Sequence, residues 1–276
     1  MIEVGLTAVA EHPSLSPTGR ASTLADLAGY FPVVELDTGF YHAPDAALVT
    51  KWQAQVPATF QFIVKATSAM TVHPGSTREQ VVADAAALEA GLQPLIAQHQ
   101  LAAILLQFPP FYGVTPGHVK YLRWLRSRFP HLPLAVEWRN ASWYAPTYRE
   151  STLSLMRELA LIHVVVDEPV TPGGSVPLVA SATNADLTIM RLHGRNVAGW
   201  QNSTGPDWRN QRTNYRYSPS ELQELGAVAK ALASKRVIVI FNNNGGGDAA
   251  ANALAFIKQE GLHFPHLGPR QLGLLD

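Results

Sequence analysis

The sequence of 276 residues contains no cysteine. Its absence excludes disulfide bonds, thiolate metal sites and a cysteine nucleophile. Charge is also scarce, because charged residues make up only 15% of the chain and 21 basic residues are balanced by 21 acidic ones. A protein dedicated to duplex nucleic acid usually presents a net basic face. Overall neutrality disfavours that class, although it leaves room for a local basic groove.

Long hydrophobic runs are missing too. No apolar stretch approaches the roughly 18 residues that a membrane-spanning helix needs, so we expect no membrane partner. The first residues lack a basic stretch followed by an apolar segment, so we expect no secretory signal and a cytoplasmic location. Hydrophobic residues form 47% of the chain, which is typical of a well-buried globular protein. The length fits one large domain over residues 1–276.

Eight short apolar segments recur along the chain, and most are rich in β-branched residues. Most read as continuous apolar runs that do not alternate with polar residues. Strands buried on both faces have this pattern, because helices cover one face and a barrel interior covers the other. The segments are Ile2–Leu6, Val33–Asp37, Phe60–Lys65, Ala102–Phe108, Leu134–Arg139, His163–Asp167, Leu187–His193 and Val237–Asn242.

Helical patterns separate most of these segments. Thr115 before Pro116 and Ser218 before Pro219 are helix-start signals, because Ser and Thr cap helices and Pro favours the first helical position. Gly261 is a helix-stop signal. The expected helices are Asp45–Ala54, Ser76–Gln98, Thr115–Phe129, Tyr148–Leu161, Pro219–Ala233 and Asp248–Glu260.

Strand and helix alternate eight times, which predicts an α/β fold with a single closed (β/α)8 barrel, the TIM barrel. The alternative is an open doubly wound sheet. The lack of a phosphate-cradling glycine motif after the first strand favours the barrel. Two long loops are expected at about 168–186 and 194–217. Loops of this length in a compact domain are usually functional lids or disordered insertions.

Polar residues stand where most of the predicted strands end. In a TIM barrel these ends face one mouth, where active sites lie. Residues two apart share one face of a strand, so Glu137 lies beside Arg139 and Arg191 beside His193. The strand-end residues are Glu35, Asp37, Lys65, Gln107, Glu137, Arg139, Asp167, Arg191, His193, Asn242 and Asn243.

Each strand-end residue taken singly fits a solvated edge position or a structural ion pair. Together they predict a functional pocket, because buried charges on adjacent strands neutralise one another where a lone charge would be costly. Other polar and aromatic residues have plainer interpretations. Trp138 and Trp143 are interpreted as wall or core, and His73 as a surface loop residue. Asn242 and Asn243 fit a backbone turn equally well.

Several segments match short motifs of a known family, in the family's order. They are residues 34–41 (VELDTGFY), 60–65 (FQFIVK), 70–73 (MTVH), 106–110 (LQFPP), 135–143 (AVEWRNASW), 191–195 (RLHGR) and 241–243 (FNN). From about residue 30 to its end, the chain resembles the YecE/YunF-like family, also called domain of unknown function 72. Two features depart from the family pattern. Val72 is an extra residue between Thr71 and His73, and a glycine-tryptophan segment after the first strand is missing.

The resemblance implies a TIM barrel, and it implies no settled reaction, because the family is named for lacking one. It also points to a set of matched pocket positions. These are Glu35, Lys65, Gln107, Glu137, Arg139, Asp167, Arg191, His193, Asn242 and Asn243.

The pocket charges favour an enzyme that acts by general acid/base chemistry on a small phosphorylated, carboxylated or sugar-like anion. Lyase, isomerase and hydrolase reactions all fit, because a balanced array of buried charges separates acid from base roles. We expect Glu35 or Glu137 as base and His193 as acid or electrophile. The expected catalytic residues are Glu35, Lys65, Glu137, Asp167 and His193. Lys65 supplies a charge or forms an imine. The expected substrate-binding residues are Gln107, Arg139, Arg191, Asn242 and Asn243, with the arginines holding the anion.

Two alternatives stay open. One is a divalent-metal-dependent phosphodiester hydrolase, because carboxylates and His193 suit Mg²⁺ or Mn²⁺. Three cations in the same mouth argue against it, so we expect no metal and no cofactor. The other is a non-catalytic nucleic-acid or ligand-binding module, whose aromatic and Arg residues in 194–217 stack on single-stranded bases. A lid over the barrel mouth is the plainer interpretation of that segment. The sequence does not indicate the oligomeric state.

Overall fold

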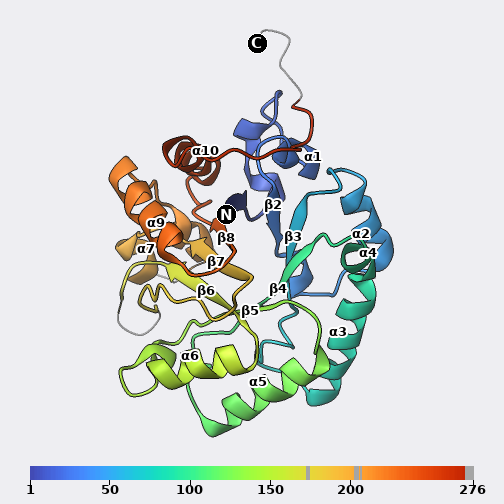
Figure 1. Ribbon diagram of the computed structural model, residues 1–276, viewed down its shortest axis with the longest axis vertical. Coiled ribbons are helices and arrows are strands. Elements are labelled where there is room, and N and C mark those ends of the chain that lie inside the picture. The colour runs from blue at the N-terminus through green and yellow to red at the C-terminus, as the bar shows by residue number, and fades with distance from the viewer. Residues whose placement is uncertain (172–174, 202–204, 206, 271–276) are drawn as a thin grey trace.

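Eight parallel strands close into a barrel in the computed structural model, which describes residues 1–171, 175–201, 205 and 207–270. Each strand pairs with the next one along the chain, and β8 pairs with β1. Helices surround the strands (Figure 1). The predicted closed (β/α)8 barrel is therefore confirmed. The strands are β1 (Ile2–Leu6), β2 (Val33–Leu36), β3 (Gln61–Lys65), β4 (Leu101–Gln107), β5 (Leu134–Glu137), β6 (Ile162–Asp167), β7 (Leu187–Leu192) and β8 (Arg236–Phe241).

The helices mostly follow the sequence pattern, with two differences. The expected helix 76–98 is two helices, because Pro94 fits only the first turn of a helix and a new helix starts there. Three helices of five or six residues were not predicted, because they are too short to display a helical period. The α-helices are α1 (Leu24–Ala28), α2 (Ala46–Gln53), α3 (Arg78–Gly91), α4 (Gln93–Ala97), α5 (Pro116–Arg128), α6 (Arg149–Glu158), α7 (Val197–Gln201), α8 (Trp208–Thr213), α9 (Pro219–Ala231) and α10 (Ala249–Gln259). Short 3-10 helices are η1 (Val9–Glu11), η2 (Pro13–Leu15), η3 (Thr38–Phe40) and η4 (Ala141–Tyr144).

The two predicted long loops differ in structure. In the described part of 168–186 there is no helix or strand, whereas 194–217 carries α7 and α8. Residues 172–174 of the first segment, and 202–204 and 206 of the second, lie outside the described residues.

Polar caps set the helix starts that the sequence indicated. The Thr115 hydroxyl accepts a hydrogen bond from the His118 amide at 3.1 Å, which satisfies a free N–H at the start of α5. At α9, the Ser218 hydroxyl accepts from the Glu221 amide at 3.3 Å, while the Glu221 carboxylate accepts from the Ser218 amide at 2.8 Å. The Thr115 cap and this reciprocal capping box confirm the predicted starts of α5 and α9.

The core lies inside the barrel and between the strands and the helices. Every residue of β2, β5, β6 and β7 is buried, as the continuous apolar runs predicted. Trp138 and Trp143 are 0% exposed, and their rings stack with centroids 4.0 Å apart. The Trp143 indole N–H donates to the Tyr112 carbonyl oxygen at 2.7 Å. The core interpretation of both tryptophans is confirmed, and this stack anchors the segment that carries Arg139.

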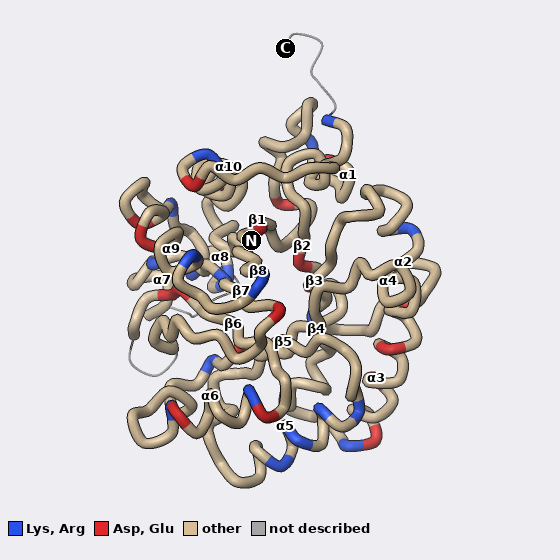
Figure 2. Tube along the Cα trace, in the orientation of Figure 1, with Lys and Arg blue, Asp and Glu red and all other residues tan. Residues whose placement is uncertain are grey.

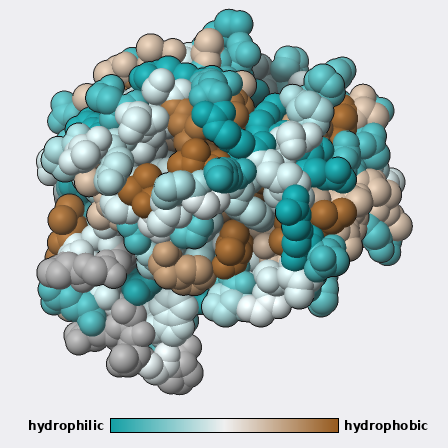
Figure 3. Space-filling model, turned by 90° about the horizontal axis from the view of Figure 1, so that it is seen from below, coloured by the Kyte–Doolittle hydropathy of each residue, from teal (hydrophilic) through white to brown (hydrophobic). Residues whose placement is uncertain are grey.

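The surface shows no single large apolar area on the face drawn in Figure 3, where hydrophobic residues occur as separate patches among hydrophilic ones. Scattered exposed apolar side chains of this kind are ordinary. None of the helices in the described residues is long and apolar enough to cross a membrane.

Gly91 marks a close approach between α3 and the chain before α2. A Cβ atom there would lie 1.8 Å from the Pro44 carbonyl oxygen. We expect Gly91→Ala to lower the free energy of unfolding by about 1–3 kcal/mol, because the backbone must shift to admit the methyl group. The matched control is Gly117→Ala in α5, whose nearest atom is Thr115 Oγ1 at 3.8 Å. It should raise stability by up to about 1 kcal/mol or leave it unchanged. Equal urea unfolding midpoints for the two variants would contradict this steric argument.

Candidate active site

A cavity of about 550 Å³ opens at the C-terminal ends of the strands. Small-molecule sites usually measure roughly 300–1,000 Å³. Acidic and basic residues occur at the centre of the barrel as well as on the outer helices (Figure 2). The predicted site residues that line the cavity are Glu35, Lys65, Gln107, Arg139, Arg191, His193 and Asn242.

Arg191, on β7, joins two glutamates that come from distant strands. Its Nε and Nη2 atoms donate to the two oxygens of Glu35 at 2.8 and 2.6 Å. Its Nη1 atom pairs with Oε2 of Glu137 and lies 3.3 Å from Oε1 of Gln107. All three charged side chains are at most 3% exposed. Most of the guanidinium donors are therefore used inside the protein.

A second arginine extends this row of charges. The Nη1 atom of Arg139 lies 3.0 Å from Oε1 of Glu137 and 2.9 Å from Oε2 of Glu168. Burial disfavours an ionised Glu137, but Arg191, His193 and Arg139 together outweigh burial and hold the pKa of Glu137 well below its usual range. We call the resulting row of acidic and basic side chains, Glu35–Arg191–Glu137–Arg139–Glu168, the buried ion chain.

His193 lies against this chain as a neutral ring. Burial lowers its pKa to about 3, so the imidazole is uncharged at pH 7. Its Nε2 atom is 3.2 Å from Arg139 Nη1 and 3.4 Å from Glu137 Oε1. The side-chain amide of Asn242 contacts Nδ1 at 2.7 Å, and this hydrogen bond determines which ring nitrogen carries the proton. The predicted pairs Glu137/Arg139 and Arg191/His193 do point to the same side of their strands.

Lys65, at the end of β3, is the amine of the cavity. Its Nζ atom lies 4.9 Å from the centroid of the Phe40 ring. Within the described part of the chain it makes no hydrogen bond and no ion pair. Burial, followed by the nearby charge of Arg191, lowers the pKa of Lys65. His73, interpreted from the sequence as a surface residue, lies half-buried in the same wall with its ring 5.0 Å from Phe40.

At the end of β6, the predicted Asp167 and its neighbour Glu168 have different partners. Asp167 is not among the cavity-lining residues, because its carboxylate pairs with Arg195 at 2.7 Å and accepts from the Tyr217 hydroxyl at 2.6 Å. Consecutive residues of an extended chain point to opposite sides, so it is Glu168 that reaches Arg139. The sequence analysis missed Glu168. Its position one residue after a predicted strand end was the available signal.

Two other predicted residues lie outside the cavity lining. Glu137 is fully buried beneath it, inside the ion chain. Asn243 is also 0% exposed, and its Nδ2 atom donates to the Tyr215 carbonyl at 2.8 Å and to Asn252 Oδ1 at 2.9 Å. Asn243 therefore satisfies buried polar groups at the end of β8, which was the alternative interpretation of that pair.

The α7–α8 segment forms one wall of the cavity. The Trp200 ring lies between two guanidinium groups, 5.0 Å from that of Arg139 and 4.8 Å from that of Arg212. Arg212 is also 4.8 Å from the Trp208 ring. Trp200 is 5% exposed, whereas Trp208 and Arg209 face the cavity from α8. Alternating cations and indoles thus connect this segment to the buried ion chain.

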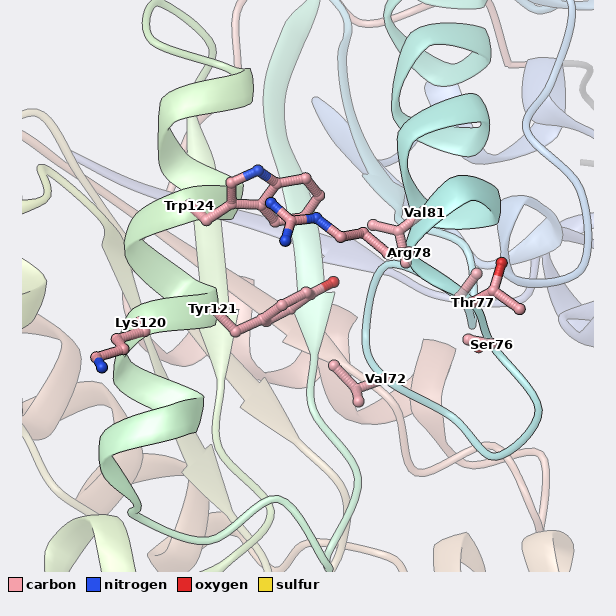
Figure 4. A pocket seen from close by; sticks show the side chains of 9 residues that line it. Val72, Ser76, Thr77, Arg78, Val81, Lys120, Tyr121 and Trp124 are labelled. Atoms are coloured by element: carbon pink, nitrogen blue, oxygen red, sulfur yellow. The ribbon is translucent and has the colours of Figure 1, made fainter.

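A second cavity of about 440 Å³ lies between α3 and α5 (Figure 4). Its walls are mainly apolar and include Val81, Tyr121 and Trp124, with the Arg78 guanidinium 5.1 Å from the Trp124 ring. It contains none of the strand-end residues. The groups suited to acid/base chemistry are therefore concentrated in the cavity at the strand ends.

Glu35, Glu137 and Glu168 near the strand-end cavity are paired with arginines. Over the residues that the structure describes, no three His, Asp or Glu side chains are arranged to hold a metal ion. The oxygens of Glu35 and Glu137 accept from Arg191 and Arg139 instead.

Glu168 gives the site a pH dependence that stability measurements can isolate. Burial raises its pKa to about 7, so the folded state keeps a proton that the unfolded chain releases near pH 4.5. Its contribution to stability is full below about pH 4.5 and is lost as the pH rises through 7. We expect the unfolding free energy of the wild type, minus that of Glu168→Gln, to fall by about 3 kcal/mol between pH 4.5 and 7.5.

Denaturant unfolding at a series of pH values measures this difference. Glu158→Gln is the control, because Glu158 is an exposed carboxylate whose pKa is lowered by Arg123. Its difference from the wild type should be flat above about pH 5. A flat or rising difference for Glu168→Gln would overturn the assignment.

Comparisons with known proteins agree with the motifs at the strand ends. The family model described as "Protein of unknown function DUF72" matches residues 4–272. The chain is 40% identical to UPF0759 protein YunF of Bacillus subtilis (strain 168), over 99% of this chain and 100% of that protein. It is 38% identical to a crystal structure of a DUF72 family protein from Enterococcus faecalis V583, with a TM-score of 0.91 and coverage of 99% and 100% of the two chains.

A second solved relative is more distant and has the same fold. It is a DUF72 family protein from Thermotoga maritima MSB8, which is 29% identical, with a TM-score of 0.77 and coverage of 95% of this chain and 100% of that chain. The resemblance seen in the sequence is confirmed, and the chain belongs to the family of proteins of unknown function DUF72.

Proposed function

We propose that this protein is an enzyme that binds a small anionic metabolite in the strand-end cavity and transfers protons on it. The observation that carries the proposal is the buried ion chain under that cavity. Burying five ionisable groups costs stability, and well-packed apolar residues would often be at least as stable. Charges retained at such a cost, at the face where TIM barrels carry their active sites, support a catalytic role.

Arg191 was expected to hold the anion, but we assign anion binding to arginines at the rim of the cavity instead. Arg191 uses most of its donors on Glu35 and Glu137, so we assign to it the positioning of those two side chains. Arg209 and Arg212 of α8 line the other side of the cavity. Guanidinium groups bind carboxylates and phosphates through paired hydrogen bonds. This wall supports a substrate whose anionic group faces α8.

Proton transfer is assigned to Lys65 and His193. Burial lowers the pKa of Lys65, and a lysine of this kind is a suitable general base. A neutral His193 presents one N–H donor and one acceptor, which suits hydrogen bonding to a carbonyl or hydroxyl oxygen of the substrate. Glu137 lies beneath the cavity with a pKa well below its usual range, so its proposed role is to orient His193 and Arg139. The amides of Gln107 and Asn242 supply further polar contacts.

The α7–α8 segment is better suited to a lid than to a nucleic-acid groove. Single-stranded bases stack on aromatic rings that a protein leaves accessible. Among the rings of 194–217, Trp200 is 5% exposed and Tyr217 is 3% exposed, and Tyr217 donates its hydroxyl proton to Asp167. Trp208 and Tyr215 are half-buried. A lid that covers a small substrate shields proton transfer from water.

A divalent metal would provide the competing chemistry. We expect removal of metals with EDTA to leave the melting temperature unchanged, and millimolar Mg²⁺ or Mn²⁺ to leave it unchanged as well. The reason is that arginines already neutralise Glu35 and Glu137. A metal-dependent rise in melting temperature that Glu137→Gln abolishes would favour the phosphodiester hydrolase alternative instead.

A melting-temperature screen of small carboxylates, phosphates and sugar acids tests the proposed function. A ligand at 100 times its Kd stabilises the folded protein by about 2.7 kcal/mol. We expect at least one compound to stabilise the wild type, and Asn242→Ala and Arg209→Ala to bind it about tenfold or more weakly.

The control variant is Trp124→Ala, in the second cavity between α3 and α5. It should respond to the compound as the wild type does. The proposal fails if no compound stabilises the wild type. It also fails if the response is the same in all variants or is lost only in Trp124→Ala.

A further inference from the structure

We propose that Lys65 forms a covalent imine with the bound metabolite, so that the substrate class is a small anionic aldehyde or ketone. This inference rests on the proposed function, because it uses the same cavity and the same anionic ligand. It goes further by naming the reacting bond and the group that attacks it; where Lys65 is the nucleophile, proton transfer falls to His193.

Lys65 differs in its surroundings from the other five lysines of the chain. Lys230 pairs with Glu260 at 2.6 Å and Lys235 with Asp186 at 2.8 Å, and both are more than half exposed. The remaining three are also exposed. Lys65 alone among them lines the strand-end cavity, at the end of a barrel strand. It is the one lysine whose side chain lines the cavity where a ligand would bind.

Two of the three carboxylates near Lys65 are engaged with arginines, and the third, Asp37, lines the same cavity. Both oxygens of Glu35 accept from Arg191, and both oxygens of Glu137 are paired with Arg191 and Arg139. The face of the Phe40 ring, 4.9 Å from Nζ, attracts the ammonium form. The charges of Glu35, Glu137 and Asp37 also favour that form, but less strongly than burial and Arg191 oppose it. Burial and the Arg191 charge lower the pKa of Lys65, which increases the fraction of free amine at neutral pH. The free amine is the form that attacks a carbonyl carbon.

The reaction balances without an oxidant, a reductant or another reagent. The nitrogen lone pair attacks the carbonyl carbon, and the carbon–oxygen π pair moves to oxygen. One proton passes from nitrogen to oxygen to give a carbinolamine. The carbon–oxygen bond then breaks and the second amine proton leaves with the oxygen as water, which forms the C=N bond. His193 lies in the same cavity as a neutral ring able to accept one proton and release another.

The anionic end of the substrate is placed by the rest of the cavity. Arg209 and Arg212 come from α8, whereas Lys65 comes from β3. The anionic group and the carbonyl group of the metabolite would therefore contact different walls of the cavity. The volume of about 550 Å³ admits a compound of the size of an oxo acid or a sugar phosphate.

Borohydride reduction traps the imine and tests the proposal. The full-length protein is incubated at pH 7 with glyoxylate, pyruvate or dihydroxyacetone phosphate, then reduced with sodium borohydride and analysed by intact mass and peptide mapping. We expect a stable adduct on Lys65 with at least one probe, at least about tenfold above that on any exposed lysine.

Lys65→Arg is the critical variant, because it keeps the positive charge and removes the nucleophilic amine. It should abolish the adduct while its melting temperature stays close to that of the wild type. Lys120→Arg, in the second cavity between α3 and α5, should keep the Lys65 adduct. Labelling spread evenly over the lysines, or none on Lys65 with all three probes, would overturn the imine.

The two experiments distinguish failure of the imine from failure of the proposed function. If a metabolite stabilises the wild type and Asn242→Ala weakens its binding, while Lys65 stays unlabelled, then the imine is wrong and the acid/base enzyme stands. If Lys65 is labelled and Lys65→Arg retains the binding of an anion that has no carbonyl group, the imine is supported as a covalent step separate from anion binding.

Discussion

The pairing of Arg191 with Glu35 and Glu137 is the interaction on which the rest of the site depends. One guanidinium from β7 reaches across the barrel interior to carboxylates from β2 and β5, and all three groups are buried. Loss of one partner would leave a buried charge uncompensated, at a cost of about 3–5 kcal/mol. The upper interior of the barrel is therefore held by charge, whereas the strands below it are held by apolar packing. Side chains fixed on strands by such buried ion pairs are positioned more accurately than side chains on loops.

The buried ion chain also determines which groups of the cavity remain available for chemistry. Because the glutamates are neutralised by arginines, the cavity presents Lys65 and His193, both with lowered pKa values. Arg139 belongs both to the buried ion chain and to the α7–α8 wall, since it contacts Glu137 and stacks against Trp200. The position of that wall and the position of the buried charges are thus linked through one side chain. Such a link would make enclosure of a substrate depend on an intact ion chain.

The fold followed from the sequence because its signals are local. Eight β-branched apolar runs, separated by helical periods and caps such as Thr115 and Ser218, have few arrangements other than a barrel. The strand-end rule placed Lys65, Arg191 and His193 in one cavity for the same reason. At β6 the rule pointed to Asp167, whereas the adjacent Glu168 pairs with Arg139. A strand that is apolar on both faces does not reveal in its sequence which residue points inward.

The amino-acid sequence by itself determined that this chain is an α/β barrel and that polar side chains gather at one rim. It determined this because strand and helix periods repeat and because all parallel strands end on the same side. Only the tertiary structure decided which charges pair. Arg191 meets Glu35 across 156 positions of chain, and Glu168 replaces Asp167 beside Arg139. Partner choice depends on the register of strands around a closed ring and on distances between residues remote in sequence. Neither quantity is written in any local pattern.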